Sequence, residues 1–205
     1  MTNLDQLSLS EIRDRLHDQA KTTYDVPPEM SVGKPREAAV LIPFLRINDR
    51  WEILFIRRAT YEGDRHSGQI AFAGGKREDC DPSLSATALR EAQEEVGIKA
   101  RDVELLGKIN HHHTISQFQV TPFVGTVDWP YQLELDDTEV ARAFTIPLSW
   151  LADSQNYREQ KRKHPDASRP WPIVYYDYFD GELLWGATAR MTLSLIALLR
   201  QSQNE

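Results

Sequence analysis

Three glutamates, Glu91, Glu94 and Glu95, stand close together in the sequence. On a helix, residues three and four apart share a face, so Glu91 would lie beside both of the others. Like charges at this spacing destabilise a helix by about 0.2–0.5 kcal/mol per pair, and a bound divalent cation would reverse that effect. Because carboxylate oxygens are the ligands that Mg²⁺ and Mn²⁺ prefer, the cluster predicts a site for one of these ions.

The residues around the glutamates support this interpretation. Gly74 and Gly75 can hold backbone conformations forbidden to other residues and let the main chain approach a ligand closely. We therefore expect Gly75 to contribute to the metal site and Gly74 to the substrate site. Arg90, which is always charged, would orient the acids by forked hydrogen bonds, and we place it in the catalytic group in that supporting role. Alone, the three acids would more often form a solvated acidic surface.

A helix is predicted from Leu84 to Val96, where it would hold the acids in place. The segment has no glycine or proline, follows Asp81-Pro82-Ser83 and stops at Gly97, which combines a helix start signal with a C-terminal glycine cap. Its other side carries Leu89, Ala92 and Val96 and can be buried. The acids would then project from a fixed base, which a precise site needs.

The other segments alternate between helix and strand patterns. A helix is predicted over Ser8–Ala20, where Ser8 and Glu11 have capping-box spacing. A proline-containing loop should follow, and then a β-hairpin with Asn48-Asp49-Arg50 at its turn. The predicted ranges are a loop at 21–35, hairpin strands at 38–47 and 51–57, a short strand at 70–73 with a turn at the two glycines, extended segments at 103–109, 117–127, 143–146 and 173–179, and a final helix at 187–200.

The composition bounds the class of protein. The chain has 205 residues, 40% of them hydrophobic and 27% charged, which is enough for one sizeable core. The net charge of -7 argues against a broad basic face for nucleic acids, so we expect no such partner. Cys80 is the only cysteine, and we expect no membrane segment or signal peptide; the expected location is cytoplasmic. A homodimer is compatible with the sequence.

The motif around the acids resembles the signature of the Nudix hydrolases. That signature is a glycine, five residues, a glutamate, seven residues, then Arg-Glu, an apolar residue, any residue, Glu-Glu, any residue and Gly. The second half matches from Arg90 to Ile98. In the first half, five residues after Gly75 lead to Asp81, and eight residues then precede Arg90. A one-residue insertion with aspartate for glutamate accounts for both departures.

Further segments look like the coenzyme A pyrophosphatase branch of that family. They are 67–72 followed by the two glycines, 87–92, 120–125, 146–148 and 185–190, and they cover most of the chain after about residue 37. Two positions depart from the branch. Ala73 stands where the branch has proline, and Asp64 stands where it has an arginine; Arg58 and Arg65 lie nearby and could substitute.

The resemblance implies an α/β fold of the α+β type, an α/β/α sandwich with a mixed β-sheet. We expect residues 1–36 to be an N-terminal extension and residues 37–205 the hydrolase domain. It also implies metal-dependent attack of water on a diphosphate, with Mg²⁺ or Mn²⁺ held by the three glutamates and a small nucleotide as substrate. The general base would be Glu94 on the helix or Glu139 in a later loop, although Glu139 would suit a turn equally well.

Several alternatives stay open from the sequence. The substrate would be coenzyme A or an acyl-CoA, giving 3′,5′-ADP and phosphopantetheine, or another nucleotide derivative such as ADP-ribose, NADH or a nucleotide sugar. A non-catalytic binding module is the third class. The basic stretch 156–169 is a solvated loop or an anion clamp. The run His111–His113 cannot easily bind one metal ion because neighbours in a strand alternate in direction, but one could touch substrate. Trp185 and Tyr178 are packing residues or base-stacking ones.

Overall fold

The computed structural model describes residues 3–17, 34–61, 63, 66–114, 116–162 and 170–201. Its centre is a mixed eight-stranded sheet in which β1 (Arg36–Ile47) runs parallel to β7 (Phe118–Val127), while the other strand pairs are antiparallel. The order is β3-β2-β1-β7-β5, with β4 on β1, β6 on β7 and β8 on β2. The remaining strands of this sheet are β2 (Arg50–Arg58), β3 (Ile70–Ala71), β4 (Gly74–Lys76), β5 (Val103–Lys108), β6 (His112–His113) and β8 (Val140–Pro147).

The predicted hairpin forms β1 and β2, which pair from Phe44 opposite Ile53 to Ile47 opposite Arg50. Asn48 and Asp49 both have positive φ, as a two-residue hairpin turn requires. The sheet then splays, because β2 leaves β1 and β4 pairs with the first part of β1, at Ala38–Val40. The other edge of β1 is taken by β7, so β4 lies on the side that β2 has left.

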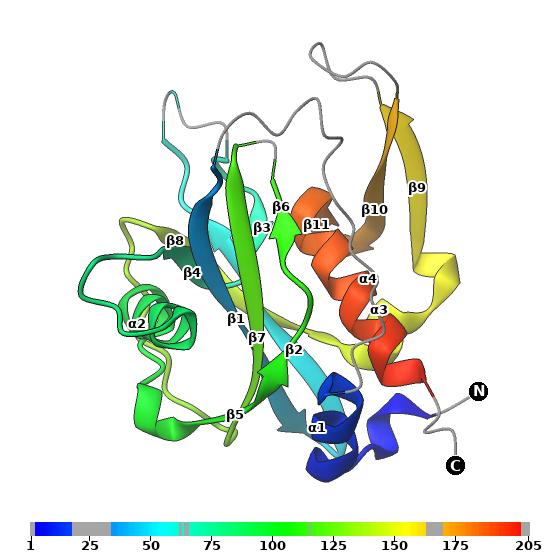
Figure 1. Ribbon diagram of the computed structural model, residues 1–205. Coiled ribbons are helices and arrows are strands. Elements are labelled where there is room, and N and C mark those ends of the chain that lie inside the picture. Colours follow the sequence, from blue (N-terminus) through cyan, green and yellow to red (C-terminus); the bar gives the residue numbers. More distant parts are fainter. Residues whose placement is uncertain are drawn as a thin grey trace.

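Helix α2 (Leu84–Val96) covers one face of the large sheet (Figure 1). Ala88, Ala92 and Val96 are fully buried there and pack with residues such as Ala39 and Leu41 of β1. The small alanine side chains let the helix approach the strands closely. The helix thus occupies the range predicted from the sequence.

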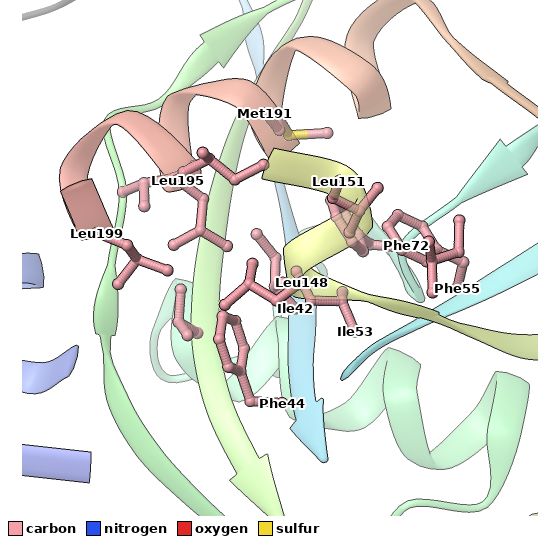
Figure 2. Close-up of a cluster of buried hydrophobic side chains, with 14 of the residues drawn as sticks. Ile42, Phe44, Ile53, Phe55, Phe72, Leu148, Leu151, Met191, Leu195 and Leu199 are labelled. Atoms are coloured by element: carbon pink, nitrogen blue, oxygen red, sulfur yellow. The ribbon is translucent and has the colours of Figure 1, made fainter. Parts of the chain in front are cut away.

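Helix α4 (Gly186–Arg200) covers the opposite face, so the fold is an α/β/α sandwich (Figure 1). Figure 2 shows Leu195 and Leu199 of α4 directed toward Ile42 and Phe44 of β1. A three-stranded sheet, β11-β10-β9, stands beside α4 and contains β9 (Tyr157–Arg162), β10 (Trp171–Phe179) and β11 (Glu182–Trp185). Short helices complete this side: α3 (Leu148–Ala152) and the single-turn 154–156.

The N-terminal residues share the same core. In α1 (Leu9–His17), Ile12 and Leu16 are buried, and the Ser8 and Glu11 side chains cap the helix reciprocally as the sequence predicts. Ile12 and Leu16 belong to the hydrophobic cluster that also contains Leu195 and Leu199. The first residues of the described chain therefore pack against its last helix.

The small sheet links to the large one through a buried carboxylate. Glu182 of β11 is 6% exposed and accepts hydrogen bonds from Arg57 of β2, at 3.1 Å, and from Arg142 of β8, at 2.9 Å. Two arginines from adjacent strands thus fix one acid, which satisfies its charge away from water. This arrangement sets the position of β11 relative to the large sheet.

Most element predictions are confirmed, and three need correction. The two glycines lie in strand β4 and not in a turn, because their backbone pairs with β1. Residues 157–162 of the basic stretch form the strand β9 rather than a loop. Their side chains are mostly exposed, and their backbone pairs with β10. The short elements β6, β11 and α3 were not predicted. The predicted loop 21–35 falls largely outside the described residues, as do residues 163–169. None of the helices in the described part of the chain is long and apolar enough to cross a membrane.

Leu195→Ala tests whether α4 is part of the core. The side chain is fully buried against the sheet, so its truncation should lower the free energy of unfolding by about 2–5 kcal/mol. Leu193→Ala is the matched control, since Leu193 is only partly buried on the same helix and should cost clearly less. Urea unfolding measures both variants, and equal costs would contradict the packing described here.

Candidate active site

The ends of α2 are fixed by local signals in the sequence. The Ser83 side chain accepts a hydrogen bond from the Ala86 N–H at the start of the helix, and Gly97 ends it in the left-handed conformation with φ 74°. The apolar face of α2 lies on the sheet, so the three glutamates differ in environment. The exposed fractions of their side chains are 3% for Glu95, 15% for Glu91 and 56% for Glu94.

Glu95 is the acid that lies deepest against the sheet. Its Oε2 accepts a hydrogen bond of 2.9 Å from the Gly74 N–H, and its Oε1 lies 3.5 Å from an Arg58 nitrogen. Burial raises the pKa of Glu95 to about 7, although the Gly74 bond and Arg58 act in the opposite direction. Glu91 and Glu139 add to the rise through like charge. A nearby cation would therefore stabilise this carboxylate strongly.

Glu91 lies against the backbone of Gly75. A Cβ atom on Gly75 would stand 2.5 Å from Glu91 Oε1, and one on Gly74 would stand 2.4 Å from the Ala39 carbonyl oxygen. Neither glycine has a positive φ, so the expectation of a forbidden backbone conformation is wrong; close approach is what excludes a side chain. Burial also raises the pKa of Glu91, against the lowering effect of Arg90.

The guanidinium of Arg90 contacts three carboxylates. It donates to both oxygens of Asp81, at 3.0 and 3.1 Å, and to Glu91 at 2.9 Å and Glu94 at 2.7 Å. Asp81 also accepts hydrogen bonds from the Glu78 N–H and the Thr87 hydroxyl. The hydrogen bonds from Arg90 and Glu78 hold the pKa of Asp81 down at about 2. The shifted aspartate of the motif thus contacts Arg90 despite the extra residue.

Glu139 approaches the same site from the start of β8. Its carbonyl oxygen accepts a 2.7 Å hydrogen bond from the Ala59 N–H, which places it next to Arg58 at the end of β2. Its side chain is exposed, and its charge raises the pKa of both Glu91 and Glu95. Two acids from α2 and one from a distant segment therefore face a common region.

A cavity of about 450 Å³ opens beside this region. Its lining includes Arg58, Gly74 and Gly75, which also contact the carboxylates. The walls are mainly apolar and come from the α4 face of the large sheet and from the C-terminal elements. They include Ala38, Val40, Ile70, Phe72, Phe118, Val120, Trp171, Ile173, Trp185 and Met191, with polar residues such as His112, His113, Thr188 and Arg190.

The structure brings together most of the residues that the sequence predicts for the site. Glu91, Glu95, Arg58 and Arg90 meet beside strand β4, next to Gly74 and Gly75. Glu139 lies at the neighbouring end of β2, where its backbone bonds to Ala59. Glu94 lies apart on the exposed side and contacts the others only through Arg90. The predicted substrate residue Arg65 lies outside the described residues.

The cavity has no recognisable signal in the sequence. Trp171 and Ile173 alternate along β10, which indicates that their side chains share one face of the strand. The local sequence does not indicate which part of the protein that face meets. Trp185 lines the cavity and stacks in parallel on Tyr175, with ring centroids 5.7 Å apart, whereas Tyr178 is 70% exposed. His112 and His113 also line the cavity.

The donor atoms suit a hard divalent cation. Carboxylate oxygens of Glu91 and Glu95 and backbone groups of β4 lie close together, and oxygen ligands of this kind are those that Mg²⁺ and Mn²⁺ prefer. In the described residues, no group of three or more acidic, histidine or cysteine side chains converges closely enough to hold an ion as it stands. Arg58 and Arg90 contact the two carboxylates instead.

Comparison with known proteins agrees with this geometry. Residues 35–168 match the NUDIX domain. The "Uncharacterized Nudix hydrolase NudL" of Enterobacter sp. (strain 638) is 39% identical over 167 residues, covering 79% of this chain and 83% of that protein. The protein of the same name from Photorhabdus laumondii subsp. laumondii is 35% identical over 185 residues, with 89% and 93% covered. The crystal structure of a MutT/nudix family protein from Enterococcus faecalis has a TM-score of 0.51 at 17% identity, covering 93% of this chain and 68% of that one, which shows the fold alone.

Asp81→Asn tests the anchor of Arg90. At neutral pH the variant should lose about 2 kcal/mol of unfolding free energy, because a charge-assisted pair becomes neutral on one side. The folded-state pKa of Asp81 lies below its unfolded value, so its contribution is complete above about pH 4 and is lost as the pH falls through about 2. The difference between wild type and variant should shrink over that range in acid unfolding.

Asp79→Asn is the matched control for this measurement. Asp79 is exposed in the same loop, so the change should alter the unfolding free energy by less than about 0.5 kcal/mol. A difference between wild type and Asp81→Asn that stays constant down to pH 2 would contradict the assigned anchor.

Proposed function

Because this chain belongs to the Nudix hydrolase family and is a pyrophosphohydrolase acting on phosphorus-containing anhydrides, we propose that its substrate is coenzyme A or an acyl-CoA. Water would cleave the diphosphate linkage to give 3′,5′-ADP and phosphopantetheine or its acyl form. Family members act on nucleoside diphosphate derivatives, the class to which coenzyme A and its acyl thioesters belong.

The observation that carries the proposal is the position of Arg58. It lines the cavity together with the two glycines, and one of its nitrogens lies 3.5 Å from Glu95 Oε1. A guanidinium at that point can bind a phosphate oxygen while the cavity receives the rest of the molecule. The segments that resemble the coenzyme A pyrophosphatase branch, 67–72 with the two glycines and 185–190, line or adjoin this cavity.

Hydrolases of this family generally use divalent metal ions such as Mg²⁺ or Mn²⁺. We assign the ion to Glu91 and Glu95 with the backbone of Gly75, and Glu94 would join them if it turned inward from the surface. When bound, the ion would neutralise the diphosphate oxygens and lower the pKa of the attacking water. The raised pKa of Glu95, which burial causes, fits a carboxylate whose partner is a cation.

The chain's own residues would supply the other functions. Glu139 is exposed, and its negative charge raises the pKa of Glu91 and Glu95. It would accept the proton of the attacking water as general base. Glu94 is the second candidate for that step. Arg90 would keep Glu91 in place, because one guanidinium ties it to the buried Asp81. Arg58 would exchange its ion pair with Glu95 for hydrogen bonds to a phosphate oxygen of the substrate.

The first test is phosphate-product release by the purified protein with Mg²⁺ or Mn²⁺ from coenzyme A, ADP-ribose, NADH and a nucleoside triphosphate. We expect metal-dependent cleavage of coenzyme A. Glu95→Gln should reduce kcat by more than the roughly 10- to 100-fold typical for a residue that only supports a ligand. Gln93→Glu, the reverse change at an exposed position of the same helix, should keep wild-type activity.

Each other outcome of this panel has a defined meaning. Cleavage of another compound of the panel in place of coenzyme A would reject coenzyme A as the substrate, while the assignment of the site as that of a hydrolase would stand. Undiminished cleavage by Glu95→Gln would remove that residue from the metal site. Metal binding without turnover of any member of the panel would reject both coenzyme A and the assigned catalytic groups.

The two glycines allow the metal assignment to be tested without turnover. In Gly75→Ala the new methyl group meets the flexible Glu91 carboxylate, so Mn²⁺ affinity should fall about tenfold or more. In Gly74→Ala it meets backbone atoms of Ala39 and Val40, so unfolding free energy should fall by about 1–3 kcal/mol. Mn²⁺ titration by electron paramagnetic resonance and urea unfolding separate the two effects. Unchanged Mn²⁺ affinity in Gly75→Ala would contradict the site.

A further inference from the structure

One wall of the cavity is the face of the large sheet opposite α2. Alternate residues of β1, Ala38 and Val40, and of β7, Phe118 and Val120, line it. Side chains two apart on a strand point to the same face, so these four form a continuous apolar surface. The neighbouring Ala39 points the other way, toward α2. Helix α2, which carries the carboxylates, and the cavity thus lie on opposite faces of β1.

The second wall comes from the C-terminal unit, defined here as β10, β11 and α4. Trp171 and Ile173 of β10, Trp185 and Met191 line this side. Trp185 is supported from behind by the parallel ring of Tyr175. Residues 35–168 match the NUDIX domain, so this wall lies outside the matched segment. One of the two walls of the cavity is therefore supplied by residues beyond the matched segment.

The cavity adjoins the carboxylate site at the two glycines. Gly74 donates to Glu95, Gly75 adjoins Glu91, and both glycines also line the cavity. Because neither has a side chain, only backbone separates the two sides at this point. A diphosphate held by Arg58 could therefore extend one arm over β4 and between the two walls.

The chemistry of the lining defines that arm. Among the described residues, no aspartate or glutamate lines the cavity. Apolar residues make up most of the lining, and its polar side chains are those of Arg58, His66, Gln69, Lys76, His112, His113, Thr114, Ser116, Thr188 and Arg190. Its volume of about 450 Å³ falls in the range of about 300–1,000 Å³ typical of sites that enclose whole ligands. Aliphatic, methionine and tryptophan side chains suit a flexible apolar chain, since methionine adapts to irregular shapes.

We propose that this cavity binds the acyl chain of an acyl-CoA, with the thioester arm passing over Gly74 and Gly75 and the chain between β7 and β10. This inference rests on the proposed function and deepens it. It makes the C-terminal unit the element that selects substrates by chain length. A nucleobase is the competing occupant.

Turnover of a chain-length series tests the assignment. Burial of each methylene is worth up to about fourfold in kcat/KM, so decanoyl-CoA should exceed coenzyme A by at least about tenfold. Ile173→Trp narrows the cavity at a half-buried wall position and should lower the ratio of kcat/KM for decanoyl-CoA over coenzyme A by about tenfold. Tyr178→Trp is the matched control, because Tyr178 is 70% exposed on the same strand, and it should keep the wild-type ratio.

If the cavity instead held the adenine base, Ile173→Trp would lower kcat/KM for both substrates alike and leave their ratio unchanged. That result, or a series in which chain length has no effect in the wild type, would overturn the proposal while leaving coenzyme A hydrolysis in place.

A binding measurement separates this inference from the proposed function. S-decanoyl-pantetheine carries the apolar arm without a diphosphate, and calorimetry should show that it binds the metal-free protein at least about tenfold more weakly in Ile173→Trp than in wild type or Tyr178→Trp. Such binding would support the acyl site even if coenzyme A itself were not cleaved. Equal affinity in all three proteins, or no binding to the wild type, would refute the acyl site.

Discussion

The burial of one carboxylate, that of Glu95, is the constraint on which the site depends. Ala88 and Ala92 bring α2 so close to the sheet that Glu95 reaches the Gly74 N–H. In the facing strand, a side chain at position 74 would meet the backbone of β1, and one at position 75 would meet the Glu91 carboxylate. An acid removed from water needs a hydrogen bond and a positive partner. The packing of the helix therefore creates the demand for a cation at the point where a diphosphate would be cleaved.

Arginines meet that demand in the structure described here, and each one belongs to a wider network. Arg90 joins α2 to the loop that precedes it through Asp81, while Arg58 joins β2 to α2 through Glu95. Glu139 is tied to the same end of β2 by its carbonyl oxygen. The groups of the site thus come from three separate segments, and the sheet fixes their relative positions.

Local signals in the sequence predict some parts of this arrangement and not others. The limits of α2 follow from Ser83 and Gly97, and the hairpin turn follows from Asn48 and Asp49. The strand at Gly74 and Gly75 does not, because glycine pairs usually indicate a turn and only contact with β1 makes them a strand. The different burial of Glu94 and Glu95 depends likewise on which side of α2 meets the sheet. Strand β9 was not predicted because its charged residues are typical of a solvated loop, whereas it is held in place by backbone pairing with β10.

The hydrophobic cluster shared by Ile12, Leu16, Leu195 and Leu199 has a consequence for how this protein could have diversified. Residues 35–168 match the family domain, yet in this chain one face of their sheet is completed by segments on either side of that range. Recombination that exchanged the matched segment alone would leave the core surface without its partners. The flanking segments should therefore have been inherited together with the domain, and their apolar positions should have changed in concert.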